Sequence, residues 1–252
     1  MVISMKDIFQ QGDVFVDDTL KTIYLTPDEP LVYDVNKWDY KQMPSIISWE
    51  QDMKNQLDMH KKQASHHLAF TFPENTLLDQ QWLDKIQTYD FELGLMELYA
   101  IESQNIKKHK NDQIKVMFVT EQTLEDYITI YRQFAEPFGK AYADESIEVI
   151  RNQFNKDSKS RVIAYKADVP VGILDLIISQ CTVEIDGFGV DESYQKQGIG
   201  STMQTFVAEV ADTKPIILIA DGEDSAKEMY IRQGYIYISY CYQILKENAK
   251  HI

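Results

Sequence analysis

The pattern of apolar and polar positions is clearest in the second half of the chain. Alternating apolar residues predict strands, and apolar residues three and four positions apart predict helices. Strands are predicted over 115–120, 161–166, 171–179, 182–190, 215–220 and 235–245, and helices over 124–135, 146–154, 198–211 and 224–232. The predicted order is strand, two helices, three strands, helix, strand, helix, strand.

The first half mixes the same two patterns. It predicts strands over 22–25, 31–35, 68–72 and 91–101, and helices over 46–59 and 77–88. Trp49, Met53 and Leu57 are four residues apart, which predicts a helix face packed against a sheet. The first half therefore reads as a second α/β segment.

The polar segment 103–114 (SQNIKKHKNDQI) separates these two halves and has no apolar periodicity. We place a domain boundary near residue 112, with an N-terminal α/β partner domain at 1–112 and a second domain at 113–252. The fold class predicted for the whole chain is α/β with a mixed sheet. A length of 252 residues also suits two domains.

Charge and composition narrow the range of partners. The chain has 25 Lys and Arg against 40 Asp and Glu, a net charge of −15. Such an acidic protein repels phosphate backbones, so no nucleic acid partner is expected. Two cysteines, no leader-like N-terminus and no apolar run of membrane-spanning length predict a cytoplasmic protein without a membrane partner.

Three histidines could suggest a metal site. His60, His66 and His67 have no carboxylate or cysteine at a recognisable ligand spacing. We therefore expect no metal, and we interpret these histidines as surface residues at the end of a helix.

The segment 183–201 carries the chemistry. It reads as a strand that enters a glycine-bearing turn and opens a helix, an arrangement whose free backbone N–H groups and helix dipole favour phosphate. A Walker A loop is excluded because Gly200 is followed by Ser201 and Lys196 precedes the glycines. A dinucleotide fingerprint is excluded because its third glycine would fall on Glu192 or Met203.

The run 195–200 (QKQGIG) matches the Q/R-x-x-G-x-G/A signature and resembles the GNAT superfamily of N-acetyltransferases, which use acetyl-CoA. The run 226–235 (AKEMYIRQGY) resembles that family's A-x-x-L-Y-x-x-x-G-F segment. One position departs from the family, because Glu223 replaces an asparagine that often contacts coenzyme A. The resemblance covers the second half, and the first half reads as a degenerate GNAT-like partner domain.

The resemblance also implies roles for individual residues. Backbone at Phe188, Gly189 and Val190 is expected beside the pantetheine arm, with the Val190 N–H facing the carbonyl oxygen. The residues expected around the pyrophosphate are Gln195, Lys196, Gln197, Gly198, Ile199, Gly200 and Ser201. Gly187 and Gly189 fit a bulge in the central strand, since glycine inside a strand often marks one.

Acetyl transfer to an amine needs a neutral amine and a proton for the departing thiolate. An alkyl amine with a pKa near 10.4 is about one part in a thousand neutral at pH 7, so deprotonation is worth about 4 to 5 kcal/mol. No histidine occurs between residues 110 and 250. Glu184 resembles the catalytic glutamate of the histone-acetylating branch, eleven residues before Gln195. Asp186 is the reserve base, and ordered water is the alternative.

Tyr230 matches the tyrosine that protonates the leaving thiolate in many members of the family. The expected function is acetyl transfer from acetyl-CoA to a primary amine of a small molecule, a free amino acid or a polyamine. Acetylation of a protein lysine or N-terminus, and a non-catalytic acyl-CoA sensor, are the alternatives. The first half is expected to shape the acceptor site, and the sequence leaves the oligomeric state open.

Overall fold

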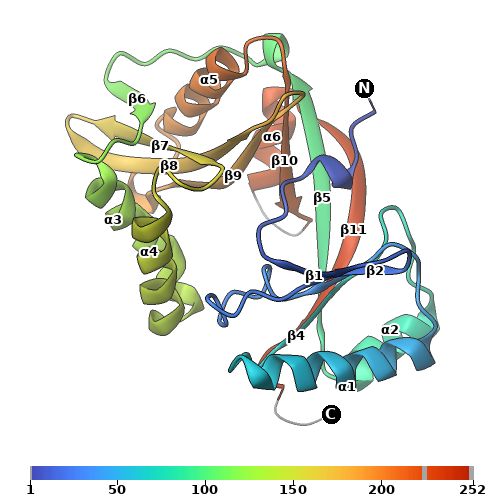
Figure 1. Cartoon of the computed structure of the whole chain (residues 1–252). Helices are drawn as coiled ribbons and strands as arrows, with labels where there is room; N and C mark the ends of the chain where they lie inside the picture. Colours follow the sequence, from blue (N-terminus) through green and yellow to red (C-terminus); the bar gives the residue numbers. More distant parts are fainter. Residues whose placement is uncertain (1, 223–225, 250–252) are drawn as a thin grey trace. The chain divides into compact units, whose positions relative to one another are not determined.

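The computed structural model describes residues 2–222 and 226–249, which form a mixed α/β fold (Figure 1). Contacts divide these residues into two compact units. Unit 1 holds residues 2–9, 98–220 and 226–238, and unit 2 holds residues 10–97, 221–222 and 239–249. Two long strands, β5 (Glu92–Glu102) and β11 (Ile236–Lys246), contribute residues to both units. These two units do not correspond to a single cut of the chain at residue 112. The domain boundary placed near residue 112 stays a prediction.

Unit 1 contains a mixed sheet with the strand order β5-β10-β9-β8-β7-β6. The bounds of its strands are β6 Ile114–Phe118, β7 Lys159–Lys166, β8 Val169–Ile178, β9 Val183–Val190 and β10 Pro215–Asp221. Neighbours from β6 to β9 are antiparallel, whereas β9 and β10 are parallel. The helices are α3 Leu124–Ala135, α4 Lys140–Gln153, α5 Ile199–Ala211 and α6 Ala226–Gln233, with short turns η1 Met5–Asp7, η2 Ser103–Asn105, η3 Glu136–Phe138 and η4 Glu192–Tyr194.

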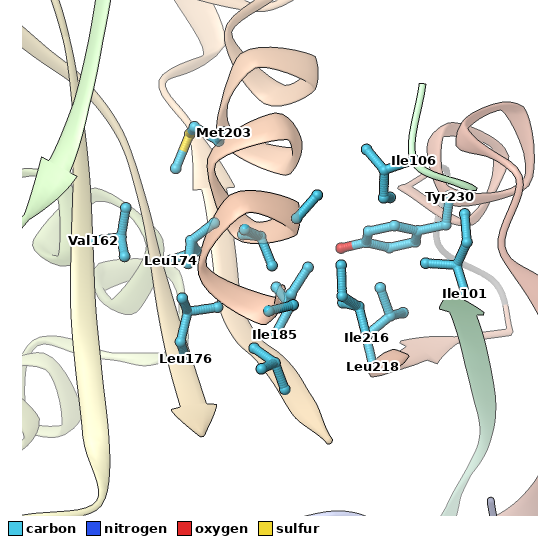
Figure 2. Close-up of a cluster of buried hydrophobic side chains, with 14 of the residues drawn as sticks. Ile101, Ile106, Val162, Leu174, Leu176, Ile185, Met203, Ile216, Leu218 and Tyr230 are labelled. Atoms are coloured by element: carbon cyan, nitrogen blue, oxygen red, sulfur yellow. The ribbon is translucent and has the colours of Figure 1, made fainter. Parts of the chain in front are cut away.

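Different helices pack on the two faces of this sheet. On one face, Val183 and Ile185 of β9 join a core with Met203 of α5 and Tyr230 of α6 (Figure 2). On the other face, α3 and α4 pack on the strands β6 to β8 through residues such as Ile163. Successive strand residues alternate between faces, so this alternation decides which site residue meets which helices.

Unit 2 contains the strand order β1-β2-β3-β4-β11, with β1 Val14–Asp17, β2 Lys21–Tyr24, β3 Trp38–Tyr40 and β4 Leu68–Thr71. Its helices are α1 (Ile46–Lys62) and α2 (Gln80–Thr88). The side chains of Ser45 and Asp79 cap the two helix N-termini. As predicted, Trp49, Met53 and Leu57 bury one face of α1 against the sheet, in a core with Phe70 and Ile244.

Three expectations for unit 2 are wrong. Residues 31–35 form turns instead of a strand, because Asn36 binds this segment through the carbonyls of Glu29 and Val32. The actual strand, β3, follows directly after these turns. His60 and His67 are buried rather than surface residues, and only His66 is exposed.

The buried histidines have a physical reason. The chain turns at Ala64, whose φ is 63°, and places His67 against the last turn of α1. A ring nitrogen of His60 lies 2.7 Å from the His67 carbonyl oxygen, and one of His67 lies 2.9 Å from the Asn36 carbonyl oxygen. Burial lowers the pKa of His60 to about 4, and burial together with His60 lowers the pKa of His67 to about 3.

No helix within residues 2–222 and 226–249 is long and apolar enough to cross a membrane.

Candidate active site

The strands β9 and β10 stay paired over a short distance only. The paired residues are Val183 with Ile216, Glu184 with Ile217 and Ile185 with Leu218. Beyond Ile185, β9 continues to Val190 beside β8 alone, and β10 continues separately to Asp221. The two parallel strands therefore part at the middle of the sheet, which leaves one edge of β9 unpaired with β10.

A bulge lies where the strands part. Asp175 pairs with Asp186 and Ile173 pairs with Gly189, so β9 uses one more residue than β8 over this interval. Gly187 adopts a φ of 54°, which is the left-handed conformation that glycine provides at such bulges. The predicted bulge at Gly187 is confirmed. It reverses the alternation, so Phe188 packs on the α5 and α6 side.

Gly189 has a different reason to be glycine. A Cβ atom at this position would lie 2.4 Å from the Cε2 atom of Phe134 in α3. The glycine therefore allows the ring of Phe134 to pack directly on the backbone of β9.

The N-terminus of α5 follows β9 through η4 and a tight turn. Gly198 is the N-cap, has a φ of 82° and gives the helix no side-chain cap. The first backbone N–H groups of a helix lack carbonyl partners within it, and the helix dipole makes this end electropositive. A Cβ at Gly198 would lie 2.6 Å from Nε2 of His109, and one at Gly200 would lie 3.3 Å from Sδ of Met229. The glycines thus let His109 and Met229 lie directly against the turn. The electropositive end of α5 fits an anion such as a pyrophosphate.

Side chains around this turn brace it. Lys196 is exposed and adopts a φ of 59°. Nε2 of Gln195 donates to the Val190 carbonyl over 3.3 Å, and Oε1 of Gln197 accepts from Nζ of Lys166 over 2.5 Å. Oγ of Ser201 accepts from Gln233 in α6 over 3.0 Å. These contacts connect the end of β9, the turn and α6, so the turn is held open by neighbouring elements.

Tyr230 lies on the α5 and α6 side of the sheet. Its ring centroid is 6.4 Å from that of Phe188 and 5.6 Å from that of Tyr235. Figure 2 shows the Tyr230 ring among the side chains of Ile101, Ile106 and Ile216, with its hydroxyl oxygen pointing away from Ile101, and the residue is buried. The structure therefore brings together Tyr230 and Phe188, two residues that the sequence assigns to one site.

Glu184 lies on the opposite face. It alternates with Val183 and Ile185, which face α5, and its side chain is 7% exposed. Its Oε2 atom accepts a hydrogen bond from the backbone N–H of Phe9 over 2.7 Å. Such a bond favours the ionised carboxylate, the form that can accept a proton.

Asp186 shares this face and belongs to a partly exposed ionic cluster with Lys159 and Asp175. Its Oδ2 accepts from Nζ of Lys159 over 2.8 Å, and its Oδ1 accepts from the backbone N–H of Gly187 over 2.8 Å. The Oδ2 of Asp175 lies 3.8 Å from the same Nζ atom. Burial opposes the charge of Lys159, but these two carboxylates raise its pKa above its usual value. With both oxygens engaged and a permanent cation beside it, Asp186 is a weaker base candidate than Glu184.

Two contacts escaped the sequence reasoning. The segment 103–113 is not a loose linker, because His109 N–H donates to Thr205 Oγ1 over 2.8 Å and Lys107 Nζ donates to the Arg232 carbonyl over 2.6 Å. A histidine therefore lies beside Gly198, although none follows residue 109 until residue 251. The second contact is the hydrogen bond from the Phe9 N–H to Glu184. Glu223, the departure from the family motif, lies outside the described residues.

A central sheet whose parallel strands part beside an uncapped helix N-terminus is the arrangement of the GNAT fold. Residues 127–235 match the model of the acetyltransferase (GNAT) family, so this part of the chain is a GNAT domain. Residues 3–99 match a second model, a domain of unknown function, DUF5613. A search of curated proteins finds no match.

Solved structures extend this result. A functionally unknown conserved protein from Staphylococcus epidermidis is 44% identical over 98% of both chains, with a TM-score of 0.94. A GCN5-related N-acetyltransferase from Kribbella flavida is 14% identical, with a TM-score of 0.61 over 92% of this chain and 88% of its own. A tandem GNAT protein from the clavulanic acid biosynthesis pathway is 7% identical, with a TM-score of 0.56 over 92% of this chain and 79% of its own. The last two show likeness of fold.

Proposed function

We propose that this protein transfers the acetyl group of acetyl-CoA to a primary amine of a small molecule, with a free amino acid or a polyamine as the acceptor. The observation that carries the proposal is the parting of β9 and β10, with Glu184 on one face and Tyr230 on the other. A thioester in this opening would meet a base from one side and a proton donor from the other.

The backbone N–H groups at the start of α5 are the proposed contacts of the pyrophosphate, with Lys196 adding positive charge nearby. Backbone of Phe188, Gly189 and Val190, beyond the last residue paired with β10, is the proposed contact of the pantetheine arm. Support comes from the N-cap Gly198, which gives the first N–H groups of α5 no side-chain cap. Bound acetyl-CoA would supply an acyl carbon activated by its thioester.

The proposed chemistry assigns one proton to each of two residues. Glu184, directly or through water, takes the proton of the acceptor ammonium, and the neutral amine nitrogen then forms a bond to the acyl carbon. The carbon–sulfur bond breaks, and the Tyr230 hydroxyl gives its proton to the thiolate. The nitrogen releases its second proton through solvent, which restores the Tyr230 hydroxyl and leaves a neutral amide. The Val190 N–H is the proposed donor to the carbonyl oxygen. The net charge of −15 favours the approach of a cationic acceptor.

The N-terminal half is proposed to be a degenerate GNAT-like partner that shapes the acceptor site. Support for this role comes from the tandem GNAT protein, whose likeness of fold extends over 92% of this chain. The DUF5613 match at residues 3–99 defines the same half as a recurring domain.

The test is an acetyl-CoA turnover assay that detects the released thiol, run against panels of amino acids, polyamines, aminoglycosides and peptides. We expect turnover with one of the first two classes. Turnover with peptides alone would move the assignment to protein acetylation. Tight acetyl-CoA binding by calorimetry without turnover on any panel would identify an acyl-CoA sensor and overturn the proposal.

A further inference from the structure

Residues 3–9 belong to unit 1 although they are far in sequence from the strands they contact. Ile3, Met5 and Ile8 pack against Leu98 and Ala100 of β5 and Ile217 of β10. Figure 1 shows this N-terminal segment, in dark blue, beside β5. We refer to residues 3–9 as the N-terminal strap. It covers the sheet face opposite α5 and α6, because the residues it contacts alternate with Tyr99, Ile216 and Leu218, which face those helices.

The strap has its own internal bracing. The N–H of Ser4 donates to the Asp7 carboxylate over 2.8 Å, and the N–H of Asp7 donates to the Ser4 carbonyl over 3.0 Å. The first bond is the Asp7 half of a capping box, and the second is the backbone bond that closes η1. The strap therefore reaches its last residue, Phe9, with a defined backbone direction.

The strap ends at Glu184. The N–H of Phe9 donates to Oε2 of Glu184 over 2.7 Å, and Glu184 pairs across the sheet with Ile217, one of the residues under the strap. The apolar contact of the strap with Ile217 and the hydrogen bond from Phe9 to Glu184 thus lie at paired positions of β10 and β9. A main-chain donor cannot rotate away as a side chain can, so it fixes the carboxylate as long as the strap stays in place.

We propose that the N-terminal strap is a positioning element of the active site, in which the backbone N–H of Phe9 holds the Glu184 carboxylate in place for proton transfer. This inference rests on the proposed function, because it assigns Glu184 the role of base. It adds Phe9 as a positioning residue that acts through Glu184. The hydrogen bond favours the ionised carboxylate, so its loss should raise the carboxyl pKa by roughly one unit or more.

Other charged groups are present on the elements packed here. Asp186 on the same strand is bound by Lys159 of β7, and Asp175 of β8 lies 3.8 Å from that lysine. The strap itself carries Lys6 and Asp7, and Asp7 is engaged with Ser4. These groups are unchanged in every variant below, so they contribute equally to each measurement.

The experiment compares Phe9→Pro with Phe9→Ala in the full-length protein. Proline removes the N–H, whereas alanine removes the ring and keeps the N–H. Ile8 has φ −76° and ψ 130°, a conformation that proline tolerates in the residue before it. We expect the Glu184 carboxyl pKa, measured by NMR with carbon-13-labelled glutamate, to be roughly one unit higher in Phe9→Pro than in Phe9→Ala.

The acid limb of the kcat pH profile should move by the same amount, with the KM for acetyl-CoA unchanged. Equal carboxyl pKa values in the two variants would overturn the inference, as would a shifted pKa with an unshifted profile. If Phe9→Pro does not fold, the double variant Met5→Ala and Ile8→Ala is used instead, because it weakens the apolar contacts of the strap with β5 and β10. That variant should shift pKa and profile in the same direction, and unchanged values would overturn the inference.

The NMR measurement separates the two proposals. A wild-type protein without turnover on any amine defeats the proposed function and, with it, the positioning role. A wild-type protein that turns over, but whose Glu184 pKa is indifferent to the Phe9 N–H, keeps the proposed function and defeats the strap alone.

Discussion

Glu184 and Tyr230 lie on opposite faces of one sheet, next to the point where β9 and β10 separate. The bulge at Gly187 contributes to this arrangement, because it turns Phe188 toward Tyr230 while Glu184 and Asp186 keep the other face. One strand therefore serves both sides of the proposed reaction. The base side is defined by the N-terminal strap, α3 and α4, and the acid side by α5 and α6.

Replacing Tyr230 with Phe should lower kcat by roughly a hundredfold, because the thiolate loses its proton donor. Acetyl-CoA affinity, measured by calorimetry, should stay the same. Tyr235→Phe is the matched control: its hydroxyl donates to buried Gln204 over 2.7 Å, so this change should cost stability by about 1 to 3 kcal/mol and leave kcat intact. Equal kcat in Tyr230→Phe and wild type would remove Tyr230 from the mechanism.

Glu184→Gln keeps an acceptor for the Phe9 N–H and removes the base. The rate should fall most at neutral pH, by about two orders of magnitude, and recover toward pH 10 as the acceptor amine deprotonates by itself. Asp186→Asn should leave the shape of the pH profile unchanged, because Asp186 is engaged by Lys159. A Glu184→Gln profile parallel to that of wild type would leave ordered water as the base.

Gly198→Ala should weaken acetyl-CoA binding by tenfold or more. The new methyl group strains a backbone with a φ of 82° and meets His109 at 2.6 Å. Adding His109→Ala should restore part of the affinity, because it removes the clash and leaves the strain. Gly139→Ala has a φ of 115° with open space around it, so it should destabilise without changing affinity. Wild-type affinity in Gly198→Ala would argue against a phosphate site at this turn.

His60 and His67 predict acid sensitivity in unit 2. Their pKa values are depressed to about 4 and about 3, so the unfolded chain takes up protons near pH 6.5 before the folded one does. Their stabilisation is therefore complete above pH 6.5 and decreases toward pH 4, by about 1.4 kcal/mol per pH unit for each histidine. Urea unfolding at pH 7 and pH 5 measures this loss.

The control for this acid effect is a pair of matched variants. His67→Gln should flatten the pH dependence, whereas exposed His66→Gln should leave it as in wild type. The same slope in all three proteins would show that other groups cause the acid loss.

Local patterns identified most of the helices and strands, including those that carry the proposed site residues. The helix Leu124–Ala135, the β9 strand and its Gly187 bulge follow from periodicity and from one glycine conformation. The GNAT motifs placed Tyr230 and Gly198 correctly on α6 and at the cap of α5, because those motifs encode backbone geometry. These features depend on neighbours in sequence, so sequence alone could predict them.

Two of the three features that the sequence did not predict depend on distant residues. Nothing near Phe9 indicates that its N–H meets a carboxylate 175 positions later. His109 lies in a polar segment without periodicity, and only its contact with Thr205 places it against α5. Residues 31–35 have the apolar pattern of a strand. The side-chain amide of Asn36 donates to the Val32 carbonyl, and this bond favours turns. The first two contacts are tertiary hydrogen bonds, and the third is a local bond from a side chain to the backbone that outweighs strand propensity.

The pairing of β4 with β11 has a consequence for the order of folding. Phe70 pairs with Ile244, and the N-terminal strap rests on Ile217, so each unit is held together by residues that are far apart in sequence. Contacts of such long range form slowly, because the intervening chain loses conformational freedom before the contacts stabilise it. We therefore expect each unit to fold only when both ends of these long intervals are present. A fragment of residues 113–252, without β4 and β5, should not fold independently.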